Sequence, residues 1–468
     1  MTELTKEGAL YELFARGNKD VYFQADSFSS VSPFRNNYKR LPAYIHERRQ
    51  IPSINNIDFG KVVEFDFEVA GDLYTHPTLL IELPTWLPTE YAALNNNSLI
   101  QDNSGYSYGY TKGIGYFLFS KIQIYQDQIL IQEFSGDALY ATRISRGSTN
   151  LGFLENSLVG LHDGSDLSIQ RNATPKQIRL ELPLLGCQSL TDGGFPSYGV
   201  RSQIFRLRLT LRKLEDLVEC SSSTVVKPNL YPWNRSDFVH RTKSGTITQF
   251  STLDRYKMSM LNIYLETRHI YVDPDAQKAL VETPTEVLFS RLYENVFYFN
   301  EKDYAPLING AVASVLKRID AVHPSSRIVF FLRQKSDIDI NRLWKINSDT
   351  ANQEYYNNIS LIIASRDRET LFSSFVWNLV AQHAKEERYS GEGLGVMNWD
   401  LGEQRGRRAP FPHQPEGSVN FSTADKPNLY VELQNISGSN RNTEMLLIVD
   451  TWGIYEIENR RGRLKYSN

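Results

Sequence analysis

The chain changes character at Ser221-Ser-Ser-Thr-Val-Val-Lys-Pro-Asn-Leu-Tyr-Pro-Trp-Asn-Arg-Ser-Asp237, near the middle of its length. Apolar and polar residues alternate before this stretch, over 205–212, and again after it, over 256–265. The stretch itself contains a serine cluster and two prolines, Pro228 and Pro232, which suit neither a strand nor a helix. We therefore interpret residues 221–237 as a linker between two β-rich halves of similar length.

The composition limits the size and the class of the protein. The chain has 468 residues, which at roughly 100–200 residues per domain suggests two or three domains. A hydrophobic content of 41% with 12% aromatic residues excludes a disordered chain and a fibrous repeat. The 51 basic and 54 acidic residues leave a formal charge of -3, so no general positive field attracts nucleic acid or an anionic membrane. We expect no direct binding of nucleic acid.

The cysteines and the N-terminus indicate a soluble chain that is made inside the cell. Only Cys187 and Cys220 are present, which excludes a disulfide-rich secreted scaffold. Reduced thiols are favoured, and a single bridge between the two stays open. The first residues, Met1 to Gly8, have neither the basic nor the apolar region of a signal peptide. The most apolar runs, such as 445–449, are far shorter than the roughly 20 residues that span a bilayer.

Alternation with period two predicts strands throughout the first half. Over 61–69, valine and phenylalanine alternate with acidic residues, which places one face in a core and the other in solvent. Further strands are predicted at 79–84, at 121–132 as a hairpin with its turn near Gln126-Asp127, at 178–183 and at 205–212. Asn95 to Gly113 is rich in Asn, Ser, Gly and Tyr and is predicted to be a long loop.

The second half repeats this pattern without obvious sequence identity. Strands are predicted at 256–265, 296–299, 327–332, 360–364, 429–433 and 445–449. Leu371, Phe375 and Leu379 recur every four residues and predict a helix packed on this half. Residues 312–319 also match helical spacing. Residues 381–425, rich in glycine and then in proline, are predicted to leave the second sandwich as an excursion.

Strands separated by long loops, with few helices, favour antiparallel sandwiches over βαβ units. The expected fold is all-β, with two tandem antiparallel sandwiches and a few short helices in loops. The expected domains are an N-terminal segment at 1–20 with a short helix over 6–16, a first sandwich at 21–220 with a strand that starts near Asp20, the linker at 221–237, and a second sandwich at 238–468.

The sequence shows no motif for catalysis, a cofactor or a metal. The eight histidines are scattered singly, and no Cys-x-x-Cys occurs, so a zinc site has no support. His383 and Glu387 are four residues apart and are interpreted as a surface pair. No Gly-x-Ser-x-Gly elbow or phosphate-binding loop is present. We expect no enzymatic activity, no catalytic residue, no cofactor and no metal site.

One alternative function stays open. A pair of carboxylates that meet only in space cannot be recognised in a single sequence. Because the chain is rich in tyrosine and tryptophan, a tandem β-sandwich that binds carbohydrate, or a glycosidase, is the alternative.

Two basic clusters have two readings. They are Arg405-Gly-Arg-Arg408 and Arg460-Arg-Gly-Arg463, the second followed by Lys465. They are interpreted as a solvated loop and tail, or as contacts with a neighbouring subunit or an anionic inner layer. Six Asn-x-Ser/Thr sequons are taken as chance in a chain without a signal peptide. They lie at Asn96, Asn172, Asn234, Asn358, Asn420 and Asn435.

Four stretches resemble the major capsid proteins of nucleocytoplasmic large DNA viruses. They are 8–23, which reads GALYELFARGNKDVYF; Gly71-Asp-Leu with Leu80-Ile-Glu-Leu-Pro84; 323–333, which reads HPSSRIVFFLR; and 411–422, which reads FPHQPEGSVNFS. Gly417-Ser-Val-Asn-Phe-Ser422 is the most specific of them. The four stretches are spread over nearly the whole chain.

The resemblance implies a fold and an assembly. Each half would be an eight-stranded jelly roll, and residues 312–319 would form a strand. The chain would be a homotrimer that forms a pseudo-hexameric capsomer, and such capsomers would tile the icosahedral shell of a large double-stranded DNA virus. Its partners would be neighbouring capsomers and minor capsid and penton proteins, close to an internal viral membrane. Its location would be the virion, after assembly in the host cytoplasm.

The resemblance also implies roles for loops. Residues 95–113 and 381–425 would supply an outer tower or clamps between subunits. The segment 1–20 would reach minor capsid proteins or the membrane side.

Overall fold

The computed structural model describes most of the chain from residue 43 onward. The described residues are 43–67, 71–84, 99–101, 104, 106–145, 160, 177–185, 194–200, 203–231, 239–241, 247–249, 260–282, 285–346, 354–380, 393–399, 417–434 and 441–466. The chain divides into two compact units, 1–43 and 44–468, and every element below belongs to the second. The helix predicted at 6–16, the strand predicted from Asp20 and most of the excursion at 381–425 lie outside the described residues.

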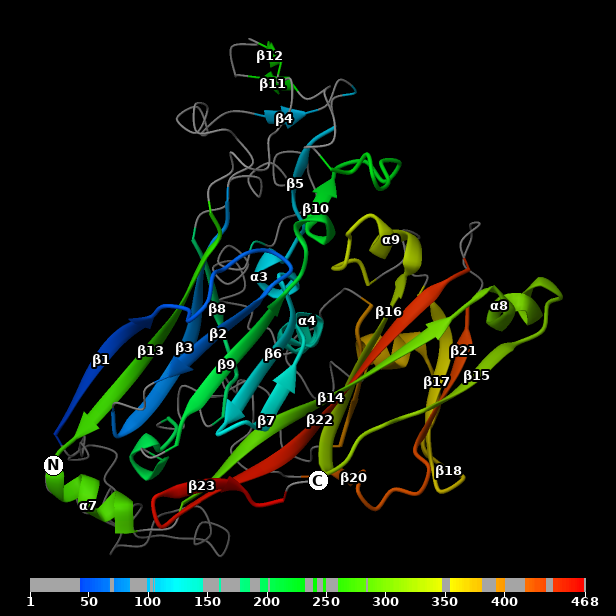
Figure 1. Ribbon diagram of the computed structural model, residues 1–468. Helices are drawn as coiled ribbons and strands as arrows, with labels where there is room; N and C mark the ends of the chain where they lie inside the picture. Colours follow the sequence, from blue (N-terminus) through cyan, green and yellow to red (C-terminus); the bar gives the residue numbers. More distant parts are fainter. Residues whose placement is uncertain are drawn as a thin grey trace, which may run out of the picture. The chain divides into compact units, whose positions relative to one another are not determined.

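The first sandwich consists of two four-stranded antiparallel sheets (Figure 1). One sheet has the order β1 (Tyr44–Ile51), β13 (Asn262–Val272), β3 (Leu73–Glu82) and β8 (Ile178–Glu181). The other has the order β2 (Val62–Phe67), β9 (Phe205–Leu211), β6 (Phe119–Gln126) and β7 (Ile129–Phe134). In β2 and β9 every second side chain is buried, as the period-two pattern predicts. Burial of each large apolar side chain contributes roughly 1.5–3 kcal/mol to stability.

The second sandwich has the same plan. One sheet has the order β14 (Thr285–Phe299), β22 (Thr443–Glu458), β16 (Pro324–Gln334) and β19 (Gly395–Asn398). In that sheet, β20 (Val419–Asn420) also pairs with β16, and β23 (Arg461–Leu464) pairs with β22. The other sheet has the order β15 (Ala313–Arg318), β21 (Asn428–Leu433), β17 (Tyr356–Ile363) and β18 (Arg366–Ser373).

The two halves have identical strand orders. Numbered one to eight within each half, the main strands form one sheet in the order one, eight, three, six and the other in the order two, seven, four, five. This pattern, in which the last strand returns beside the first, is the jelly roll. The prediction of an all-β double jelly roll with eight main strands in each half is confirmed.

One domain boundary is corrected by β13. The sequence predicts that the second sandwich starts at residue 238, but β13 lies between β1 and β3 in the first sandwich. The prediction fails because the eighth strand of a jelly roll pairs with the first strand, far away in sequence, and local linker signals do not reveal such a pairing. The second sandwich begins at β14, after helix α7 (Pro274–Glu282).

Among the described residues, helices are few and short, as predicted. They are α3 (Ile114–Phe117), α4 (Gly136–Ser145), α7, α8 (Glu301–Ile308) and α9 (Lys335–Asp339), with 3-10 turns η2 (Ser197–Val200) and η3 (Leu214–Asp216) and the π-helical turn η6 (Val376–Val380). The helix predicted from Leu371 is wrong in its first part, because Leu371 belongs to β18 and helical backbone begins only at residue 374. Residues 313–318 form β15, as the resemblance implies and against the helical spacing.

The loop predicted at 95–113 contains two short strands. These are β4 (Leu99–Gln101) and β5 (Tyr108–Tyr110), which pair with strands from the region after β9. The partners are β10 (Val218–Cys220) and β11 (Val239–Arg241), and β12 (Ile247–Gln249) pairs with β11. Figure 1 shows these strands at its top, beyond one end of the first sandwich. Two long excursions of one sandwich thus pair with each other. We call the strands β4, β5, β10, β11 and β12 the upper sheets.

The predicted hairpin at 121–132 is confirmed. β6 ends at Gln126 and β7 begins at Ile129, which leaves a two-residue turn. Both turn residues, Asp127 and Gln128, have positive φ angles of 45° and 78°, as a type I′ turn requires.

Candidate interaction surfaces

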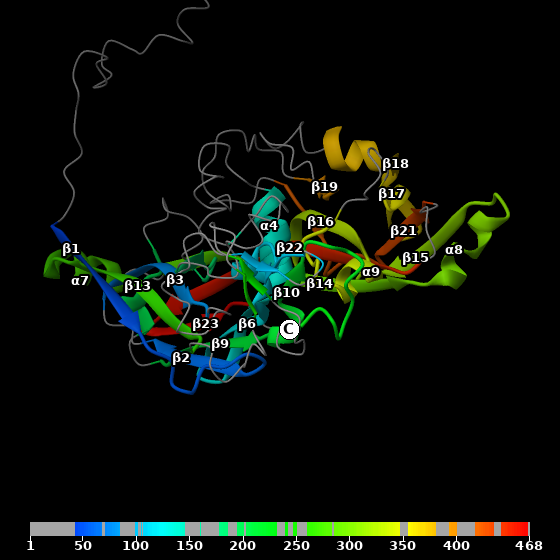
Figure 2. The ribbon, with the colours of Figure 1, turned by 90° about the horizontal axis from the view of Figure 1, so that it is seen from above.

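The two sandwiches meet where α4 packs on the outer face of the β14-β22-β16-β19 sheet. α4 follows β7 directly, and its Ala138 and Ala141 are fully buried. In Figure 2 α4 lies beside β16 and β22. The apolar residues of this contact form one cluster: Ala138, Ala141, Val329, Phe331, Ile346, Leu394, Val396, Leu446 and Ile448. The small alanine side chains allow close approach of the helix to the sheet. We call this contact the internal junction.

Buried ion pairs cross the internal junction. Asp137, in the first turn of α4, bonds Arg212 from the first sandwich and Arg333 from the second, the latter at 2.7 Å. Arg333 also donates to Glu444 at 2.6 Å. Burial alone would raise the pKa of Asp137, but the two guanidinium groups outweigh burial and lower the pKa to about 2. The carboxylate therefore stays charged at neutral pH and holds one cation from each sandwich.

A second buried charge bridges the halves at the other end of α4. Arg327, which is 0% exposed, donates from Nε to the Asp450 carboxylate at 3.2 Å. Its Nη1 donates to the hydroxyl of Ser145, the last residue of α4, at 3.2 Å. Removal of one partner of such a buried pair is costly, because it leaves the other charge uncompensated.

Strand β7 also contacts β14. Gln132 donates from its side chain to the Ser290 carbonyl at 2.9 Å. The backbone N–H of Ser135 donates to the Glu294 carboxylate at 2.6 Å. Burial raises the pKa of Glu294 above its ordinary value, and the bonds from Ser135 oppose this rise only in part. Two carboxylates at the same junction thus have pKa values shifted in opposite directions.

The segment after β16 is hydrogen-bonded to η3 and to β10, one strand of the upper sheets. Asn341 lies in the left-handed region with a φ of 65°. Its side chain donates to the carbonyls of Glu215 and Val218 at 2.7 and 2.8 Å. Trp344 donates to the Glu219 carboxylate at 3.0 Å. These bonds join the second sandwich to η3 and β10 of the first half.

The C-terminal hairpin forms a further contact between the halves. Tyr455 of β22 donates to the side-chain oxygen of Gln126 at 2.7 Å, and Gln126 donates to the carbonyl of Gly462 at 2.8 Å. Gln203 both donates to the Gly462 carbonyl and accepts from its N–H. A Cβ on Gly462 would lie 2.0 Å from the Tyr455 hydroxyl, so only glycine fits there. Altogether, five separate groups of polar contacts and one apolar cluster fix the second sandwich against the first.

Two apolar patches are exposed on the second sandwich. One lies along β14, α8 and β15, and its exposed side chains are Val296, Tyr298, Ile308, Leu316 and, just before β15, Val312. The other consists of Leu371 and Phe372 of β18 and Phe375 just after it. Large apolar side chains that are exposed in a group are candidates for contact with other molecules.

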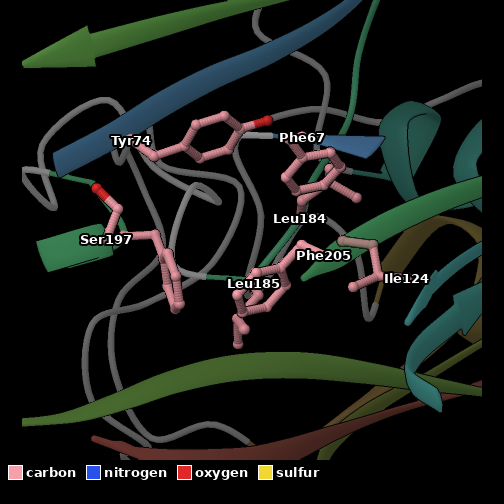
Figure 3. A pocket seen from close by; sticks show the side chains of 8 residues that line it. Phe67, Tyr74, Ile124, Leu184, Leu185, Ser197 and Phe205 are labelled. Carbon is pink, nitrogen blue, oxygen red and sulfur yellow. The ribbon is translucent and has the colours of Figure 1, made fainter. Parts of the chain in front are cut away.

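A small cavity lies inside the first sandwich (Figure 3). Its volume is about 20 Å³, and its lining is apolar except for Ser197 and the hydroxyl of Tyr74. Ser197 donates its hydroxyl proton to the Gly71 carbonyl at 2.8 Å. A space of this size holds about one water molecule, far less than a substrate or cofactor needs. We attribute the cavity to imperfect packing.

The stretches that carry the resemblance have structural roles in the described residues. The segment that begins at His323 forms β16, and Val419-Asn420 pairs with its first residues as β20. The His323 N–H donates to the Ser422 hydroxyl at 2.7 Å, so these two stretches meet. Asp72 accepts from the N–H of Val272, which ties the start of β3 to the end of β13. Each of these three described stretches holds strand ends together.

Several residues singled out in the sequence lie outside the described residues. They are His383, Glu387, the cluster 405–408 and Cys187. Cys220 is buried in β10, where its sulfur accepts from the N–H of Ser222 at 3.4 Å. In the C-terminal cluster, Arg463 is paired with Glu456 at 3.0 Å on the exposed hairpin.

The described residues offer no group of three or more His, Cys, Asp or Glu side chains that could hold a metal ion. Within the same ranges, no helix has both the length and the apolarity to cross a membrane.

Sequence reasoning missed α4, the element that makes the internal junction. A signal for it exists. The Ser135 hydroxyl accepts from the N–H of Ala138 at 3.0 Å, and Asp137 lies in the first turn. A serine cap followed by an acidic residue is a typical helix start.

Comparison with known proteins agrees with this fold. No family model matches the sequence. A probable capsid protein of Acanthamoeba polyphaga mimivirus is 20% identical over 195 residues, which cover 39% of this chain and 35% of that protein. The match therefore spans about a third of the length of the curated relative.

Solved structures match over much more of the chain. VP54 of PBCV-1, fitted into a reconstruction of the virophage Sputnik, superposes with a TM-score of 0.68 and 13% identity, covering 93% of this chain and all of that one. The Faustovirus major capsid protein gives a TM-score of 0.61 and 12% identity, covering 95% of both chains. The chain therefore has the double jelly-roll fold of the major capsid proteins of large DNA viruses.

Proposed function

We propose that this chain is a structural major capsid protein that forms homotrimers, and that each trimer is a pseudo-hexameric capsomer in the icosahedral shell of a large double-stranded DNA virus. The observation that carries this proposal is the internal junction, which joins two sandwiches of identical strand order through buried apolar and ionic contacts. Three copies of such a pair place six similar sandwiches around one axis, which gives nearly six-fold packing with three-fold symmetry.

The known proteins support this proposal in two ways. The fold is shared with capsid proteins over almost the whole chain, and the mimivirus relative is named a probable capsid protein. The proposed location is the virion, after assembly in the host cytoplasm. The proposed partners are neighbouring capsomers, minor capsid proteins and penton proteins, close to an internal viral membrane. In this role the chain needs no enzymatic activity, and its function resides in surfaces and loops.

The test is the mass of the purified protein by light scattering, with negative-stain electron microscopy of the same fraction. The expected species has roughly 160 kDa, three times the 53.8 kDa of one chain, and forms hexagonal plates. A monodisperse monomer at every concentration would contradict the proposal. Glycan binding by that monomer would instead support the alternative, a carbohydrate-binding tandem sandwich.

A further inference from the structure

The internal junction joins a helix of the first half to a sheet of the second half. The equivalent sheet of the first half and the equivalent helix of the second half do not meet in this way within the described part of one chain. In the first half, the fifth strand, β7, runs directly into α4, and α4 covers the outer face of the sheet that contains β14. Because the halves have the same strand order, each surface of this junction has an equivalent in the other half. The second half has an equivalent of α4, and the first half has an equivalent of the covered sheet.

The equivalent of α4 is the helical segment after β18, the fifth strand of the second half. Both positions carry a Phe-Ser pair: β7 ends at Phe134, which Ser135 follows, and β18 ends in Phe372-Ser373. Their environments differ. Phe134 is 2% exposed, whereas Phe372 is 40% exposed and the following Phe375 is 61% exposed. The second half thus has exposed apolar side chains at positions where the apolar side chain of the first half is buried.

The equivalent of the covered sheet is the outer face of β1-β13-β3-β8. Along β13, Thr267 and His269 point inward and are buried, so Arg268 and Ile270 point outward. On β1, Arg48 is the direct partner of Arg268 and shares its face. All of β1 from residue 44 to 48 is exposed, and none of the described helices packs on the outer face of this sheet as α4 packs on the other.

This outer face also has side chains that suit apolar and polar contacts together. Tyr44 is 57% exposed at the start of β1. Arg179 of β8 holds Glu266 of β13 through two bonds of 3.0 and 3.1 Å, which fixes both side chains flat on the sheet. Their aliphatic stems and Tyr44 offer apolar surface, and their heads can bond to polar groups of a partner.

We propose that Leu371, Phe372 and Phe375 of one copy dock on the outer face of the β1-β13-β3-β8 sheet of a second copy, so that the contact between copies repeats the internal junction. The inference rests on the proposed trimer and names the surfaces that build it. The two surfaces are different, so the interface is head-to-tail and leaves one free surface of each kind until a ring closes. Closure after three copies uses all of them.

The first test substitutes Phe375→Asp. A buried charge without a partner in the interface is expected to convert the trimer to monomer in light scattering, with at least a tenfold rise in the concentration needed for assembly. Ile204→Asp is the matched control, because Ile204 has the same exposed fraction of 61% but lies on neither surface. It is expected to remain trimeric. Circular dichroism checks that both variants are folded.

The second test does not depend on a destabilising change. Phe375→Cys and Arg268→Cys are combined in one chain, and the protein is treated with a short flexible bismaleimide that links two thiols. Each single variant is treated in the same way, to measure the linking that Cys187 and Cys220 cause. We expect products of two and three linked chains on a denaturing gel. Ile204→Cys with Arg268→Cys should give only the background.

The outcomes separate this inference from the proposed function. If the wild-type protein is a trimer but Phe375→Asp leaves it intact and no linked chains form, these surfaces are wrong and the trimer stands. A product linked only within one chain would mean that residue 375 of the same chain, and not of a second copy, lies beside this face, which also overturns the inference. A wild-type protein that is a monomer contradicts the proposed function itself.

Discussion

At the scale of single residues, Asp137 is the group that both sandwiches share. It binds Arg212 of the first sandwich and Arg333 of the second, and its side chain is 8% exposed. The change Asp137→Asn is expected to lower the free energy of unfolding by about 3 kcal/mol at neutral pH, because two guanidinium groups then stay buried without their carboxylate. Urea denaturation measures this. Asp66→Asn, at the exposed pair with Arg206, is the control and should cost less than about 1 kcal/mol.

The same residue predicts a dependence on acid. The pKa of Asp137 is about 2 in the folded chain, below its ordinary value of 3.8. A depressed folded pKa gives stability that is fully present above the unfolded value and is lost as pH falls through the folded one. Wild-type stability should therefore fall more steeply than that of Asp137→Asn between about pH 4 and pH 2. Parallel curves for the two proteins would contradict this role.

Glu294 should behave in the opposite way. Burial raises its pKa above the ordinary 4.5, so its protonated form is the one that folding favours. Stability from this group is present below the unfolded pKa and is lost as pH rises through the folded value. Glu294→Gln keeps the acceptor for the Ser135 N–H and removes the charge. We expect the variant to unfold at a higher temperature than wild type at pH 7 and at the same temperature near pH 4. A lower midpoint at pH 7 would refute this.

At the scale of elements, the segment after β16 positions β10 and the upper sheets. Asn341→Ala removes two bonds to backbone carbonyls and strains a residue with positive φ, so it should destabilise by roughly 2–4 kcal/mol. Asn341→Gly keeps the backbone conformation and should cost only the bonds, roughly 1–3 kcal/mol. Hydrogen exchange should speed up at Val218 to Cys220 in both. If Asn341→Gly matches wild type, the two bonds do not hold β10.

Strands were predictable where one face meets the core. The pattern over 205–211 reports burial directly, because alternate side chains of β9 are inside. β18 breaks this rule, since it is an edge strand and most of its side chains are exposed. Leu371 therefore fits a helical spacing although it lies in a strand, whereas Phe375 lies in the helical backbone that follows β18. Their exposure is instead what makes them candidates for contact with another copy.

Pairing between distant elements was not predictable from local pattern. The residues of β13 predict a strand, but nothing in them specifies β1 and β3 as neighbours. The internal junction is equally remote, because Asp137 and Arg333 lie 196 residues apart. Only the resemblance to capsid proteins led to the jelly-roll order.

At the scale of the whole molecule, the internal junction should make the two sandwiches unfold together. Buried contacts link them through α4, through the segment after β16 and through the C-terminal hairpin. We expect one transition in calorimetry for the wild-type protein, because neither sandwich keeps its buried charges satisfied when the other opens. Asp137→Asn should split or broaden this transition. Two well-separated transitions in the wild type would show that the junction does not couple the sandwiches.

The N-terminal segment should matter for assembly and not for folding. Both sandwiches belong to the unit 44–468, and none of the described strands of either sandwich comes from residues 1–16. Deletion of residues 1–16 therefore removes none of the contacts of the internal junction. The truncated protein is expected to keep the wild-type unfolding temperature and the mass of a trimer. If the segment reaches other capsid components, the yield of complete shells from virus that carries the truncated gene should fall. Phe375→Asp provides the opposite control, since it should lose the trimer before any shell can form. Normal shell yield from the truncated protein would show that the segment has no part in assembly.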